Sequence, residues 1–368
     1  MRTKKVFLLA GLWLLLVGAF FALGWRLLGL TQPRAVAPPK PAQVTETLPK
    51  PSDPAAPKPV RLFAVGDLML GRNVERVAAE EGYPWLFAKF KDQWANHDVV
   101  FGNLEGPIVT RHRPTPTGSF SFSFPTSTAT VLRDAGFTVL ALGNNHGLDQ
   151  GEAGFTQTKA ALDSVGILTA GHARDIADEH VVRWRVRDQA FALLSYNATW
   201  PQFSLAAAGE QVARAASSTG AFVIVSMHWG DEYLQQAGVR QVKIAHALIE
   251  AGANLVIGHH PHVEQNIERY QDTLIFYSLG NFVFDQYFSR ETQEGLAFSL
   301  AITPEELRYD LVPYASQRSQ PRPLEPGRRD ARLAALAASS SPELSDAIRR
   351  GTIVLPRASL PRRVAPGP

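Results

Sequence analysis

The chain has 368 residues, of which 37 are Lys or Arg and 34 are Asp or Glu, and it contains no cysteine. Without thiols there can be no disulfide framework, iron–sulfur cluster or cysteine nucleophile, so any metal must be held by imidazole and oxygen ligands. A formal net charge of +3 is too small to indicate binding to nucleic acid, and we expect no nucleic-acid partner.

The chain begins with basic residues followed by an apolar run over residues 6–30, which only Arg26 interrupts. Roughly 20 apolar residues cross a bilayer, whereas the apolar region of a cleaved signal peptide has only about 7–15. We therefore expect residues 1–30 to form one transmembrane helix, kept as an anchor in preference to removal as a signal peptide. The positive charges before this run predict a single-pass protein of the cell membrane, with the bulk of the chain extracytoplasmic.

Residues 31–59 are rich in proline and nearly free of large apolar side chains, which predicts an extended linker to the following domain. From residue 60 to 355, short apolar runs alternate with helical patterns, as is typical of an α/β domain. We expect residues 356–368 to form a disordered tail. The predicted strands cover residues 61–65, 98–101, 137–142, 191–195, 221–226, 254–257, 273–278 and 351–355, and the predicted helices cover 151–165, 239–251, 328–337 and 340–350. The alternating aromatics of residues 120–124 are typical of a half-buried strand.

Polar side chains follow six of the predicted strands, at the point where each strand ends. Taken singly, an acidic residue here is more typical of a turn or a helix cap, and one histidine of a structural residue, than of a metal site. In α/β sheets, however, the loops at the carboxyl ends of the strands converge, so side chains far apart in sequence can meet there. The six stretches are Gly66-Asp67, Asn103-Leu104-Glu105, Gly143-Asn144-Asn145-His146, Met227-His228-Trp229-Gly230, Gly258-His259-His260-Pro261-His262 and Leu279-Gly280-Asn281.

Three imidazoles within four residues are costly to place at the end of a buried strand unless a partner such as a metal ion is present. In an extended loop alternate side chains point the same way, so we expect His260 and His262 to face two adjacent ions and His259 to point elsewhere. The alternative is an exposed histidine-rich turn, which the other five strand ends disfavour. We expect His246, which lies within a predicted helix, to be structural.

With the residues that extend the first and the last, Leu68-Met69-Leu70-Gly71-Arg72 and Phe282-Val283-Phe284-Asp285-Gln286, these stretches resemble the CapA-type family of capsule biosynthesis proteins. That family is associated with poly-gamma-glutamate capsules. More distantly, the order of the stretches is similar to that of the calcineurin-like metallophosphoesterases. The resemblance covers residues 60–355 and implies a four-layer α/β/β/α sandwich with a centre of two divalent metal ions, Mn or Zn, at the strand ends.

The resemblance also implies a role for individual side chains. Glu105 stands where an Asp usually bridges both ions, and His146 would be the catalytic residue that donates a proton to the leaving atom. The implied metal ligands are Asp67, Glu105, Asn145, His228, His260 and His262. The residues expected to orient ligands or substrate are Asn103, Arg72, His259, Trp229, Glu232, Asn281 and Asp285.

The sequence departs from the superfamily pattern at Met69, which stands where a histidine is expected, and at Glu105, which replaces an Asp. A thioether is a poor ligand for a hard divalent ion, so the first site would be weak or empty unless another group, such as Asn281 or Asp285, completed it.

Two functions follow from this sequence. One is a metal-dependent hydrolase or transferase that works outside the membrane on an anionic envelope polymer, such as poly-gamma-glutamate, or on a phosphoester. The other is a noncatalytic partner of a membrane-embedded polymer synthase or export complex, in which the metal site is degenerate.

Overall fold

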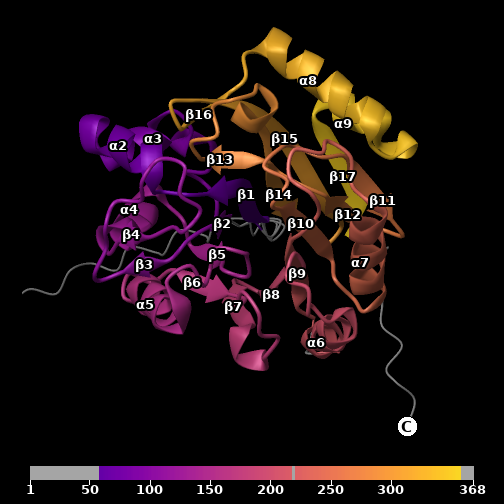
Figure 1. Ribbon diagram of the computed structural model, residues 1–368. Helices are drawn as coiled ribbons and strands as arrows, with labels where there is room; N and C mark the ends of the chain where they lie inside the picture. The colour runs from indigo at the N-terminus through magenta and orange to yellow at the C-terminus, as the bar shows by residue number, and fades with distance from the viewer. Residues whose placement is uncertain (1–57, 218–219, 358–368) are drawn as a thin grey trace, which may run out of the picture. The chain divides into compact units, whose positions relative to one another are not determined.

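The computed structural model describes residues 58–217 and 220–357 (Figure 1). The predicted transmembrane helix, nearly all of the predicted linker and residues 358–368 of the predicted tail lie outside these residues. Within them, no helix is both long enough and apolar enough to cross a bilayer.

The first of two large sheets has nine strands, seven of them in the order β16-β15-β14-β1-β2-β5-β6, with β13 beside β1 and β17 beside β15. Strands β13, β1, β2, β5 and β6 are parallel to their neighbours in this set, whereas β14 pairs antiparallel with β1 and with β15. The strands are β1 (Val60–Leu68), β2 (Val99–Leu104), β5 (Val139–Ala141), β6 (Leu168–Ala170), β13 (Asn281–Val283), β14 (Glu294–Ile302), β15 (Glu306–Gln317), β16 (Gln320–Pro323) and β17 (Thr352–Pro356).

The second sheet has six strands in the order β11-β12-β10-β9-β8-β7. Its four central strands are parallel, and β11 and β7 close the two edges as antiparallel partners. The strands are β7 (Val182–Val186), β8 (Gln189–Asn197), β9 (Phe222–His228), β10 (Leu255–His259), β11 (Ile267–Tyr270) and β12 (Thr273–Phe276), and a separate short pair is formed by β3 (Ile108–Val109) and β4 (Phe124–Pro125).

Helices cover the outer face of each sheet (Figure 1), and apolar side chains fill the space between the sheets. Because side chains alternate along a strand, β1 sends Leu62 and Ala64 into the cluster between the sheets and Phe63 and Val65 under the outer helices. Helices α2 (Arg72–Glu81), α3 (Tyr83–Ala88), α4 (Ser127–Ala135) and α5 (Gly151–Asp163) cover the first sheet, α6 (Leu205–Ser217) and α7 (Val239–Glu250) cover the second, and α8 (Pro326–Ser339) and α9 (Ser345–Arg350) pack on the cluster between them.

The structure agrees with most of the predicted elements, corrects two of them and adds a long strand pair. Each predicted strand overlaps an observed one, but the long antiparallel pair β14 and β15 was not predicted. The predicted helix 340–350 is split into a 3-10 turn, Pro342–Leu344, and α9. Residues 120–124 do not form a strand, since only Phe124 enters β4, and Phe120 is 78% exposed while Phe122 and Phe124 are buried.

Candidate metal centre

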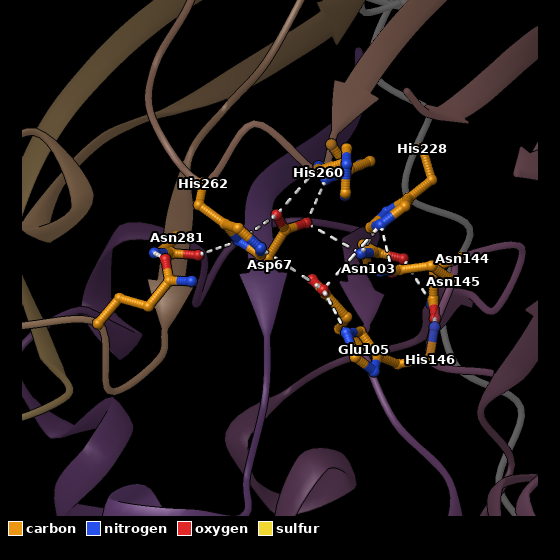
Figure 2. A network of polar contacts seen from close by, with 12 residues as sticks. Asp67, Asn103, Glu105, Asn144, Asn145, His146, His228, His260, His262 and Asn281 are labelled. Atoms are coloured by element: carbon orange, nitrogen blue, oxygen red, sulfur yellow. Dashed lines mark hydrogen bonds and ion pairs between the residues drawn. The ribbon is translucent and has the colours of Figure 1, made fainter. Parts of the chain in front are cut away.

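The carboxyl ends of strands from both sheets meet at one place and bring six predicted site residues together (Figure 2). Asp67 ends β1, Glu105 follows β2, and His146 lies in the loop after β5. From the second sheet, His228 ends β9, and the loop after β10 carries the remaining two imidazoles. The six residues are Asp67, Glu105, His146, His228, His260 and His262, and Asn145 lies beside them in the same view.

Two glycines allow the backbone to approach closely enough to form this junction. A Cβ atom on Gly66 would lie 1.8 Å from the carbonyl oxygen of Gly280, and one on Gly258 would lie 1.9 Å from that of Tyr277. The amide of Asp67 donates to the Gly280 carbonyl at 3.0 Å. The chain before β13 is thereby held against the end of β1, which places Asn281 next to Asp67 in register.

The Asp67 carboxylate is fully buried and accepts hydrogen bonds from both sheets. Asn103 Nδ2 donates to Oδ1 at 2.9 Å, His259 Nδ1 donates to Oδ1 at 3.0 Å, and the amide of His260 donates to Oδ2 at 3.3 Å. Burial raises the pKa of Asp67, but the hydrogen bond and the charge of His259 outweigh it and hold this pKa below its usual value. Asp67 is therefore an ionised, oriented carboxylate at neutral pH.

Glu105 is equally buried, yet neither of its carboxylate oxygens has a hydrogen-bond partner among the described residues. Three imidazole Nε2 atoms surround Oε1 at distances too long for a hydrogen bond: His262 at 3.8 Å, His146 at 3.9 Å and His228 at 4.0 Å. Burial, followed by the charge of Asp67, raises the pKa of Glu105 well above its usual value. An orphaned carboxylate ringed by nitrogen atoms is costly to bury unless a cation lies between them.

The distances around Glu105 fit a divalent metal ion. Bonds of about 2 Å from one ion to nitrogen and oxygen place those two ligand atoms roughly 3–4 Å apart. Ligand atoms of Asp67, Glu105 and His262 also lie within 4.8 Å of one another, as do ligand atoms of Glu232, His260 and His262. The donor set of carboxylate, imidazole and amide groups suits Mn or Zn.

Burial holds three imidazoles of the centre, those of His228, His260 and His262, in the neutral form that binds metals. Burial, and then the charge of His260, lowers the pKa of His228 well below its usual value, and burial lowers the pKa of His260 to about 4. His262 Nδ1 donates to Asn281 Oδ1 at 2.9 Å, which fixes the tautomer whose Nε2 lone pair faces Glu105. His228 Nε2 lies 2.8 Å from Asn145 Oδ1, so the two predicted ligands of the second ion are neighbours.

His146 is oriented by two residues that the sequence did not single out. Its Nδ1 lies 2.8 Å from Asp149 Oδ2, and its ring stacks on Phe122 with the centroids 4.1 Å apart. Asn144, a motif residue without a predicted role, accepts the His146 amide at 3.1 Å and donates to Asn103 Oδ1 at 3.0 Å. The spacing of Asp149, three residues after His146, could have indicated the first of these contacts.

The residues predicted to orient substrate divide into three groups. Asn103, His259 and Asn281 contact Asp67 or His262 and therefore support the ligands. Arg72 forms an ion pair with Asp285, which also accepts the amide of Asn73 at 3.0 Å, and the guanidinium lies over the Phe122 and Phe284 rings. Glu232 lies beside His260 and His262.

Trp229 is a correction to the prediction. Its indole is 1% exposed, packs in the apolar cluster beneath α6 and α7, and donates from Nε1 to the Tyr277 carbonyl at 2.8 Å. The structure therefore places Trp229 in the core, where it has no surface to offer a substrate.

The histidine loop after β10 also differs from the prediction. It is not extended, because His260 and His262 have left-handed backbone angles, with φ of 95° and 58°. His259, expected to point away, is instead buried against Asp67. The turned backbone brings all three imidazoles to the centre, which alternation along an extended loop could not do.

Comparison with known proteins identifies a family for the residues that build this centre. The sequence model of a family described as "Bacterial capsule synthesis protein PGA_cap" matches residues 61–286. The chain is 30% identical to "Capsule biosynthesis protein CapA" of Bacillus anthracis over 71% of this chain and 68% of the relative. It is 32% identical to "PGA biosynthesis protein CapA" of Bacillus subtilis (strain 168), over 71% of this chain and 73% of the relative.

Among solved structures, purple acid phosphatase PPD1 from yellow lupin (Lupinus luteus) seeds is similar over 73% of this chain and 53% of that one. The sequence identity is 7% and the TM-score is 0.36.

Proposed function

Because this chain belongs to the family of bacterial capsule synthesis proteins, we propose that it acts in the biogenesis of an anionic capsule polymer such as poly-gamma-glutamate. Its action would use a metal-dependent hydrolase or transferase site. The observation that carries this proposal is Glu105, whose buried carboxylate has no hydrogen-bond partner among the described residues and faces three imidazole nitrogens at 3.8–4.0 Å.

Two divalent ions, Mn or Zn, would be held by the ligands at the ends of β1, β2, β9 and β10 and in the loop after β5. When bound, they would supply Lewis-acid stabilisation and an activated water for attack at an anionic centre. We also infer that the helix–sheet–sheet–helix arrangement is of the metallophosphoesterase type. The residues that would hold the ions are Asp67, Glu105, Asn145, His228, His260 and His262.

His146 would supply the proton for the leaving atom. Its Nδ1 lies 2.8 Å from Asp149 Oδ2, and this contact directs Nε2 toward Glu105 and the centre. The stacked Phe122 ring keeps the imidazole from rotating out of this position. No ion is needed to hold His146, so its role is separable from metal binding.

A cavity of about 740 Å³ beside the segment after β13 supports a polyanionic substrate. Three arginines from separate parts of the chain, Arg290, Arg322 and Arg328, line it. Arg290 and Arg328 share one carboxylate oxygen of Glu294, and within the described part of the chain Arg322 donates hydrogen bonds to the amide oxygen of Gln320 alone. Most of their guanidinium N–H groups are therefore open to carboxylates of a bound polymer.

Phe288, which lines the cavity, packs edge-to-face on Tyr233 with 5.3 Å between ring centroids, and the Tyr233 ring lies 6.3 Å from that of His262. We expect Arg322→Ala to weaken binding of soluble poly-gamma-glutamate several-fold without changing metal content. Arg308→Ala, an exposed arginine of β15 paired with Asp310 and not lining the cavity, is the matched control.

The N-terminal segment bears on where this chemistry would occur. We propose that residues 1–30 anchor the chain in the cell membrane by one helix and that residues 31–59 carry the catalytic body on the extracytoplasmic side. Fusion of an alkaline phosphatase reporter after residue 357 tests this, since the reporter is active only outside the cytoplasm.

One feature favours the alternative of a noncatalytic partner of a polymer synthase or export complex. Met69, at the position of an expected ligand, is buried and accepts the Gly71 amide through its sulfur, so the site lacks one imidazole. Metal analysis together with incubation on poly-gamma-glutamate and on a phosphodiester separates the two functions. Stoichiometric Mn or Zn with product formation supports the enzyme, whereas a metal-free protein that co-purifies with a membrane synthase supports the partner.

A further inference from the structure

We propose that Glu232 is a metal ligand of this centre and takes the place of the histidine that is missing at residue 69. The inference rests on the metal centre proposed above and reassigns a residue that the sequence indicated as a contact to substrate. It also predicts which ion the centre prefers.

The groups expected to replace the missing imidazole are already engaged elsewhere. Asn281 bonds His262 through Oδ1 and donates from Nδ2 to Gln286 and to the Thr292 carbonyl. Asp285 holds Arg72 and the Asn73 amide. The polar atoms of both side chains are thus already paired, so both drop out as replacement ligands.

Glu232 is the acid that remains. One of its carboxylate oxygens lies within 4.8 Å of ligand nitrogens of both His260 and His262, and those two nitrogens lie within 4.8 Å of each other. His260 Nδ1 is buried and has no hydrogen-bond partner among the described residues. A cation bound by Glu232 could also bind this nitrogen, for which the described residues offer no hydrogen-bond partner.

The loop that carries Glu232 is fastened to the histidine loop. The amide of Tyr233 donates to the Pro261 carbonyl at 2.8 Å, between the two histidines, and Tyr233 holds a left-handed backbone with φ of 69°. A non-glycine residue adopts this conformation at a cost, so the contact that fixes it positions the residue before it.

A chain of hydrogen bonds links Glu232 to His262 through the supporting residues. Gln286 Nε2 donates to the Tyr233 hydroxyl at 3.2 Å, and Asn281 connects Gln286 to His262. The Tyr233 side chain is in turn hydrogen-bonded to Glu232. The carboxylate and the imidazole are thus oriented as one unit, as metal ligands commonly are.

Exchange of an imidazole for a carboxylate changes the chemistry of the site. Three carboxylates, those of Asp67, Glu105 and Glu232, would then face the ions, and oxygen ligands favour Mn over Zn more than imidazoles do. The centre would therefore prefer Mn, because its missing nitrogen ligand has been replaced by oxygen.

The test compares Glu232→Gln with Asp231→Asn in the full-length purified protein. After removal of metal with a chelator, Mn and Zn are titrated separately, and the bound ions are counted by elemental analysis. We expect Glu232→Gln to weaken Mn binding by at least about tenfold and to lose one ion, with Asp231→Asn unchanged. Equal losses in both variants would overturn the assignment, since they would reflect only the negative charge of the loop.

A second variant, Glu232→His, restores an imidazole. We expect it to keep the number of ions and to shift the preference from Mn toward Zn, and an unchanged preference would contradict the inference. The two proposals fail differently: a wild-type protein that binds neither ion contradicts the metal centre itself, whereas a wild-type protein with bound Mn and an unchanged Glu232→Gln contradicts only the role of Glu232.

Discussion

The histidines of this protein occur in two settings that differ in how they meet carboxylates. Outside the strand-end centre, four imidazoles lie at hydrogen-bond distance from an acidic side chain that is partly or largely exposed, and a fifth, that of His97, lies 2.7 Å from the Ser299 hydroxyl. Inside it, three imidazoles approach the buried Glu105 but stop at 3.8–4.0 Å. The outer pairs are His112 with Glu75 at 2.8 Å, His246 with Glu268 at 2.8 Å, His172 with Glu152 at 3.1 Å and His180 with Asp175 at 3.2 Å.

This difference in distance separates structural histidines from candidate metal ligands. A structural histidine forms a hydrogen bond with its carboxylate, whereas a candidate ligand faces a carboxylate that it does not reach. A direct bond at 2.8 Å satisfies both groups, so His246, which also stacks on Tyr270, is structural, as we predicted. A gap of nearly 4 Å between buried groups satisfies neither unless an ion fills it. Residue type and burial alone would not separate the two settings.

The contrast between the two histidine settings is tested most directly by a substitution of Glu105. We expect Glu105→Gln to lower the affinity for Mn by at least about a hundredfold and to abolish turnover, because it removes the carboxylate shared by the surrounding ligands. Glu268→Gln makes the same change beside His246 and should leave metal content unaltered. Elemental analysis of both purified variants checks this, and equal metal content in the two would refute the distinction.

His146 belongs to the centre but is predicted to act on the leaving atom instead of on the metal. We expect His146→Ala to reduce turnover by about 10²–10⁴-fold with bound metal nearly unchanged. Asp149→Asn should have a smaller effect, since it removes only the group that orients the ring. Turnover and metal are measured on the same preparation, and loss of metal from His146→Ala would reassign this residue as a ligand.

The orphaned carboxylate should also reveal itself in the metal-free protein. Because the pKa of Glu105 is raised in the folded state, the folded protein keeps its proton to higher pH than the unfolded chain, so this group costs stability as pH rises above about 4.5. Each unit of raised pKa costs about 1.4 kcal/mol above both values. Denaturant unfolding with chelator should show Glu105→Gln gaining on wild type as pH rises, and parallel pH profiles would contradict the raised pKa.

The smallest effect is expected at the outer histidines. Asp175, Glu179 and His180 also bring three potential ligand atoms within 4.8 Å, but the two acids are exposed and His180 already bonds Asp175. We expect Asp175→Asn to cost about 0–1 kcal/mol of unfolding free energy and to leave metal binding unchanged. A loss of metal in this variant would show that paired surface histidines also bind ions.

Much of the fold could be predicted from the sequence because parallel strands buried on both faces read as short apolar runs, as in β9 and β10. The long strands β14 and β15 were not predicted, because no polar motif follows either of them. The boundaries of α5 and α7 agree to within two residues with the predicted helices.

The members of the centre could be predicted from their place after strands, but their geometry could not. The left-handed turn at His260 depends on contacts between the two sheets, and the contact of Asp149 with His146 depends on how the loop after β5 closes. The unsatisfied state of Glu105 depends on its distances to imidazoles that lie 41 to 157 residues away in the sequence, which no local pattern encodes. Trp229 was misplaced because a motif neighbour of His228 points to the opposite face of β9.

A crystal of the protein grown with Mn and measured at the Mn absorption edge tests the metal centre most directly. We expect anomalous density between the Glu105 carboxylate and the surrounding imidazoles, with a second peak within ligand distance of Asp67, His262 or Glu232. Density that is absent at saturating Mn, with Glu105 hydrogen-bonded directly to a histidine, would contradict it.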